Sequence, residues 1–127
     1  MSDDNKYAIK ISANAFFLPE QSDEGNDQFV FAYTIKITNI GTLPSKLISR
    51  HWVITDADNK IQEVRGVGVV GEQPVLGPGE SFEYTSGSSL ETSVGTMRGT
   101  YQMVANDGTK FDAVVPEFTL SVPRVLH

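Results

Sequence analysis

The sequence predicts an all-β fold, a sandwich of about seven antiparallel strands in two packed sheets. Apolar and polar residues alternate with a period close to two along most of the chain, as in strands with one buried face. No window of about a dozen residues shows helical apolar spacing with a cap at each end. Turn-forming residues separate the alternating runs at regular intervals, which is typical of packed antiparallel sheets.

The expected strands follow one another along the whole chain. The run 29–38 alternates most regularly, and within 48–54 Arg50 is the one polar residue on the apolar side. Residues 61–64 are a shorter candidate strand. The other alternating runs are 7–13, 81–85, 97–103 and 111–120.

Polar and glycine-rich segments mark the connections. Residues 21–27 form a charged loop, and Asp107-Gly108 is the pair that favours a positive-φ hairpin turn. Residues 56–60 have the length and composition of a hairpin turn. Further connections are expected at 39–44 and 76–80.

The lone Trp52 on the third expected strand is typical of immunoglobulin-like sandwiches. Asn39-x-Gly41, followed later by Leu76-x-Pro78-Gly79, is also common in such modules. We therefore predict an immunoglobulin-like or fibronectin type III-like sandwich. A closed barrel is the alternative, since seven strands can also close.

Composition limits the function. A chain of 127 residues fits a single domain, 1–127, and its 10 basic and 16 acidic residues give a net charge of −6. This charge argues against binding to nucleic acid or to anionic lipid. With no Cys and two His, the chain lacks the residues for a thiolate or three-His zinc site, and we expect no cofactor.

No targeting signal or membrane span is expected. Met1–Lys6 is polar and acidic, and no run approaches the ~20 apolar residues of a transmembrane helix. Together with the absence of cysteine, this predicts a cytoplasmic protein.

Gly66-x-Gly68-x-x-Gly71 matches a phosphate-binding pattern. In dinucleotide-binding folds it lies between a strand and a helix, but residues 72–79 contain two prolines and two glycines and predict no helix. A glycine-rich loop can still offer consecutive N–H groups to an anion. Gly66, Gly68 and Gly71 are thus candidate phosphate ligands, unless they only permit a strand connection with φ > 0.

The same segment is apolar between its glycines. Exposed apolar residues in a loop mark a protein contact. We predict that Val69, Val70, Gln73 and Pro74 contact a protein partner, with addition of a strand at a sheet edge as one mode.

Other chemistry finds little support. His51 has the parity opposite to Trp52 and is expected on the surface, while His127 is terminal. Asp56, Asp58 and Asn59 suggest calcium, but Lys60 occupies a position where a calcium-binding loop needs a ligand, so a solvated turn is favoured. Gly79–Glu83 lacks the second glycine of a nucleophile elbow, and no other catalytic motif is present. Since neither the motifs of catalysis nor a set of metal ligands is found, we predict no enzyme, no catalytic residue and no metal site.

Motifs in order along nearly the whole chain resemble the bacterial ApaG family. They comprise Arg50-His51-Trp52-x-Ile54-Thr55, the glycine-rich run 66–74, Leu76-x-Pro78-Gly79-Glu80-x-Phe82-x-Tyr84, Gly95-x-Met97-x-Gly99-x-Tyr101-x-Met103 and Val115-Pro116-Glu117-Phe118.

The resemblance implies a fibronectin III-like sandwich and a link to cobalt and magnesium tolerance, sometimes labelled efflux. Related domains in eukaryotic F-box proteins and in a DNA-polymerase-interacting protein suggest protein binding, and the gene often neighbours a diadenosine-tetraphosphate hydrolase. Without a membrane span the chain alone is no transporter. We expect a protein-binding module whose partner is unidentified, with pyrophosphate or nucleotide binding as the alternative. A homodimer through a sheet edge stays open.

Overall fold

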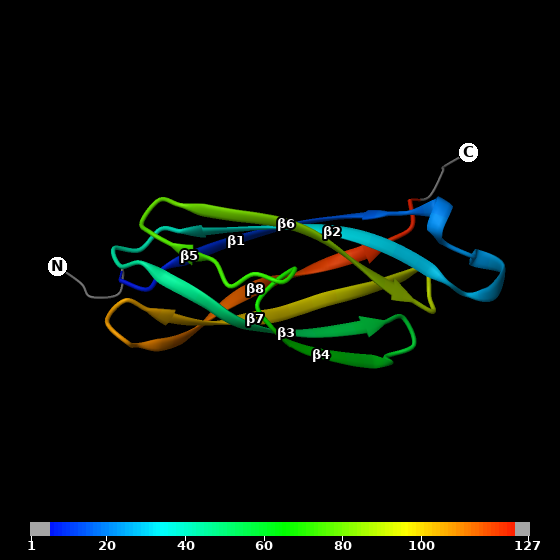
Figure 1. Ribbon diagram of the computed structural model, residues 1–127. Coiled ribbons are helices and arrows are strands. Elements are labelled where there is room, and N and C mark those ends of the chain that lie inside the picture. Colours follow the sequence, from blue (N-terminus) through cyan, green and yellow to red (C-terminus); the bar gives the residue numbers. More distant parts are fainter. Residues whose placement is uncertain (1–5, 124–127) are drawn as a thin grey trace.

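Two antiparallel sheets lie face to face in the computed structural model, which describes residues 6–123 (Figure 1). Residues 1–5, which make up most of the polar segment Met1–Lys6, and His127 lie outside the described residues. The strands are β1 (Ile9–Phe17), β2 (Phe29–Asn39), β3 (Ser45–Asp56), β4 (Ile61–Val67), β5 (Val75–Leu76), β6 (Ser81–Leu90), β7 (Val94–Ala105) and β8 (Lys110–Ser121).

One sheet has the order β1-β2-β6, and the other has the order β4-β3-β7-β8 with the two-residue β5 paired to β3. This confirms the predicted all-β sandwich, with seven long strands and one short one. Two single turns of 3-10 helix, η2 (Pro19–Gln21) and η3 (Glu24–Asn26), lie in and beside the predicted polar loop. Val75 and Leu76 form the short strand β5, which overlaps the first residue of the connection predicted at 76–80.

The core lies between the sheets and is centred on Trp52, which is 2% exposed. Its ring meets those of Tyr33, Tyr101 and Phe118 edge to face, with centroids 5.7–6.0 Å apart. Aromatic pairs prefer this geometry because the positive edge of one ring faces the negative face of another. The alternating apolar residues of β2 and β7 therefore lie on the faces of the sheets that form the core, as the sequence predicted.

Two tyrosines join the sheets inside this core. Tyr84 of β6 and Tyr101 of β7 share a hydrogen bond between their hydroxyl groups, with the oxygens 2.5 Å apart. Burial raises the pKa of Tyr84 to about 12 and also raises the pKa of Tyr101, since an ionised phenol would lose its hydration.

This pair predicts a loss of stability in alkali. In the unfolded chain both phenols ionise near pH 10, whereas the folded chain keeps them protonated to a higher pH. As pH rises above about 10, proton release favours the unfolded state, by up to about 1.4 kcal/mol per pH unit for each tyrosine. Urea titrations from pH 8 to 11 should show the free energy of unfolding falling above pH 10. Tyr84→Phe should flatten this fall and Tyr7→Phe, outside the pair, should not; equal slopes for both variants would contradict the argument.

Candidate functional site

The glycine-rich segment lies along one edge of β3. β4 pairs with residues 49–55 of β3, β5 pairs with Ser45 and Lys46, and the chain between them leaves the edge and returns (Figure 1). We call residues 68–74 the edge hairpin. It begins where Gly68 N donates to Ile48 O at 2.8 Å and ends where Leu47 N donates to Pro74 O at 3.0 Å. The register of β3 against β7 shifts between Leu47 and Ser49, so the hairpin leaves the edge at a bulge.

The tip of the edge hairpin is a two-residue turn. Val69 N donates to Glu72 O at 2.8 Å, and Glu72 N donates to Val69 O at 2.9 Å. The two residues between them have positive φ, 43° at Val70 and 81° at Gly71, as in a type I′ turn. Asn and Gly normally occupy these positions, and a β-branched residue there is a genuine outlier. Val70 is therefore held in a strained conformation at an exposed tip.

Each glycine of the pattern has a structural reason. A Cβ on Gly66 would lie 2.6 Å from the guanidinium carbon of Arg50. A Cβ on Gly68, which has a φ of 65°, would clash with the carbonyl oxygen of Glu72. Gly71 has open space around it but needs its positive φ. Whether these glycines also hold phosphate stays a prediction.

Arg50, the exception to the apolar pattern of β3, supports the base of the edge hairpin. Its Nη1 donates to Gly68 O at 2.8 Å and to Val67 O at 3.3 Å. Gln73 Nε2 donates to Ile48 O at 3.0 Å from the other arm of the hairpin. The sequence shows Arg50 as a polar residue on the apolar side of its strand. Only the fold identifies the carbonyl oxygens of Val67 and Gly68 as the atoms that it binds.

The four predicted contact residues lie in different environments. Val69 is fully buried in the core, so the exposure that its predicted partner contact requires is not met at this residue. The two-residue turn explains this, because it reverses the chain and turns the side chain of Val69 inward. Val70 is 57% exposed, Gln73 is exposed and Pro74 is half-buried. Val67 and Val75, on either side of the hairpin, are exposed as well.

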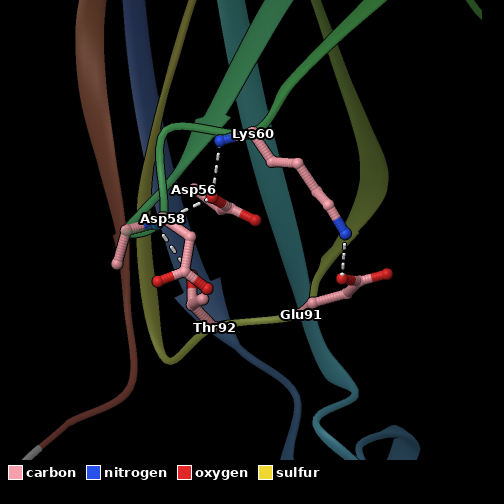
Figure 2. A network of polar contacts seen from close by, with 6 residues as sticks. Asp56, Asp58, Lys60, Glu91 and Thr92 are labelled. Atoms are coloured by element: carbon pink, nitrogen blue, oxygen red, sulfur yellow. Dashed lines mark hydrogen bonds and ion pairs between the residues drawn. The ribbon is translucent and has the colours of Figure 1, made fainter.

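The acidic segment after β3 is a hairpin turn that makes its own contacts (Figure 2). Asp56 Oδ1 accepts hydrogen bonds from the amides of Asp58 and Lys60 at 2.8 and 2.9 Å. Lys60 Nζ contacts Glu91 Oε2 at 2.7 Å, and Ala57 N donates to Thr92 Oγ1 at 3.0 Å. The turn is thus tied to the β6–β7 connection, and the predicted turn is confirmed.

His51 lies on the outer face of the five-stranded sheet, as its parity predicted, opposite Arg65 of β4 and Thr100 of β7. Its Nε2 lies 3.7 Å from Glu63 Oε1. Within residues 6–123, no three His, Asp or Glu side chains converge in a group suited to a metal ion. The same residues include no helix of the length and apolar character needed to cross a bilayer.

The two packed sheets, with strand order β1-β2-β6 against β4-β3-β7-β8, define a sandwich of the immunoglobulin and fibronectin III class. Residues 19–105 match the family model described as the ApaG domain. The chain therefore belongs to the ApaG family.

Curated relatives and a solved structure agree with this membership. The Protein ApaG of Dechloromonas aromatica (strain RCB) is 65% identical, and that of Thiobacillus denitrificans (strain ATCC 25259 / T1) is also 65% identical, each over the whole of both chains. A crystal structure from Bordetella pertussis, described as that of an ApaA protein, is 53% identical, covers 95% of this chain and 98% of its own, and has a TM-score of 0.92. None of these names carries an enzymatic activity.

Proposed function

We propose that the protein is a non-enzymatic, cytoplasmic binding module that docks a protein partner on the tip of its edge hairpin. The observation that carries this proposal is Val70, an apolar, exposed residue held at φ 43°. Strain of this kind costs of order 1–3 kcal/mol, persists only where the surrounding structure holds it, and is concentrated at functional sites. A turn with Asn or Gly at this position would avoid that cost, so the valine side chain itself is the useful element.

The surroundings of Val70 support a preformed contact. Arg50 and Gln73 fix the hairpin base, the paired amides of Val69 and Glu72 fix its tip, and Val69 anchors it in the core. A rigid apolar tip loses little conformational entropy on binding, which favours affinity.

Pyrophosphate or nucleotide binding by Gly66, Gly68 and Gly71 is the weaker candidate. The amides of Gly68, Val69 and Glu72 already donate to backbone carbonyls, and the guanidinium of Arg50 is turned toward carbonyl oxygens. An anion nest needs such amides directed outward. An NMR titration with millimolar ATP, diadenosine tetraphosphate and pyrophosphate tests this candidate. Chemical-shift changes at the amides of residues 66–71 would support phosphate binding.

Substitution of Val70 by Asn separates binding from stability. Because Asn tolerates positive φ, Val70→Asn should leave the free energy of unfolding equal or raise it by about 1 kcal/mol, while it removes the apolar contact. Affinity capture from cell extract should then lose a defined set of proteins, and one of these, purified, should bind the native chain at least tenfold more tightly than the variant.

Val114→Asn is the matched control, since Val114 is 68% exposed but lies on β8, away from the hairpin. It should capture the same proteins as the native chain. Equal capture by the native chain and Val70→Asn would contradict a docking role for the tip.

The link to cobalt and magnesium tolerance, implied by family resemblance, then acts through the partner. Calorimetric titration with Co²⁺ and Mg²⁺ checks this proposal. A saturable signal with the isolated chain would show that the protein itself binds the metal.

A further inference from the structure

The outer edge of β4 is open. In the part of the chain that the structure describes, β4 pairs with β3 alone. All its residues except Gly66 are exposed, and Ile61 and Val67 at its two ends are 62% and 75% exposed. An unpaired strand with apolar ends offers its backbone to another strand.

The direction of the free backbone groups follows from the pairing with β3. Asp56 N donates to Lys60 O, and Gly68 N donates to Ile48 O. Hydrogen-bonded pairs alternate along an antiparallel ladder, so Gln62, Val64 and Gly66 direct their N–H and C=O groups to β3. The remaining residues direct these groups to the open edge. They are Ile61, Glu63, Arg65 and Val67, and the carbonyl oxygen of Val67 also accepts the 3.3 Å hydrogen bond from Arg50 Nη1.

These four residues are complementary to themselves when read in the opposite direction. In an antiparallel pairing of two copies about a twofold axis at Val64, Glu63 stands opposite Arg65 of the second copy, and Ile61 stands opposite Val67. Every outward-directed residue then meets another one, as ladder hydrogen bonds require. Both cross-strand charge pairs are attractive, and both end pairs are apolar.

Neighbouring registers lack this complementarity. An axis at Glu63 places the two Glu63 carboxylates opposite each other, and an axis at Arg65 does the same with two guanidinium groups. Like charges directly opposite each other destabilise a sheet. An axis between two residues would set outward-directed groups against inward-directed ones. Only the register centred on Val64 satisfies both conditions among these choices.

We infer that β4 pairs with β4 of a second copy of this chain, about a twofold axis at Val64, so that the five-stranded sheets of two protomers become continuous. Such an isologous contact closes on itself and leaves the β4 edge covered in both protomers. The paired stretch ends at Val67, one residue before the edge hairpin, so dimerisation and docking at Val70 use different residues. This inference goes beyond the proposed function.

Charge reversal tests the register. Sedimentation of the native chain over a concentration series should give twice the mass of the chain at the upper end. Glu63→Arg and Arg65→Glu each place like charges opposite each other at two positions of the dimer, and each should weaken association by roughly tenfold or more. The double variant Glu63→Arg/Arg65→Glu restores opposite charges and should recover the native dimer.

The control is Lys110→Glu, which reverses an exposed charge on β8 and should leave association unchanged. Thermal unfolding of each variant shows whether the fold is retained. A native chain that stays monomeric at several hundred micromolar would overturn the inference. A dimer that the single reversals leave intact, or that the double variant fails to restore, would also overturn it. None of these results affects the capture experiment at Val70, so the dimer and the docking site are tested separately.

Discussion

Trp52→Ala should destabilise the fold by about 3–5 kcal/mol. Trp52 is 2% exposed and contacts Tyr33, Tyr101 and Phe118, so its removal leaves a cavity between the two sheets that these large rings cannot fill without moving. Since a domain of this size has a total stability of only about 5–15 kcal/mol, the loss is a large share of it. Urea unfolding monitored by circular dichroism measures the change.

Trp52→Phe provides the matched comparison. The indole N–H of Trp52 has no hydrogen-bond partner among the described residues. Replacement by Phe therefore reduces the volume of the ring but removes no hydrogen bond. It should cost clearly less than Ala. Equal losses for Ala and Phe would mean that packing of the ring is not what stabilises this centre.

Asn39→Ala should be the most damaging change at a polar position, with a loss of about 3 kcal/mol or more. Asn39 is fully buried at the end of β2. Its Nδ2 donates to Leu43 O and to Leu76 O, both at 2.8 Å, and its Oδ1 accepts from Gly41 N at 2.8 Å. The variant leaves all three backbone groups without this partner, and each buried unsatisfied group costs roughly 1–3 kcal/mol.

Asn39→Asp sharpens this test. Asp keeps the acceptor for Gly41 N but replaces the donor with a carboxylate oxygen facing two carbonyl oxygens, so it should destabilise at least as much as Ala. Asn106→Ala, at an exposed turn, should change the free energy of unfolding by less than about 0.5 kcal/mol. A mild effect of Asn39→Asp would show that the two donated bonds contribute little.

The fold could be predicted because its signals are local. Alternation in β2 and β7, the absence of helical spacing, and the turn residues at 56–60 and 106–108 each depend on a few neighbouring residues. The edge hairpin was recognised only as a glycine-rich segment. Its tip lacks the usual residues of a two-residue turn, since Val70 occupies a position that favours Asn or Gly.

The sequence by itself predicted the seven long strands and the sandwich, and it indicated the stretch 66–79 as the expected location of function. The tertiary structure alone decided which valine faces outward, what Arg50 binds and which edge is open. Val69 and Val70 are adjacent and chemically identical, yet one is fully buried and the other is 57% exposed. The physical reason is that burial and edge pairing depend on β3 and the core, which approach this segment only after the chain has folded.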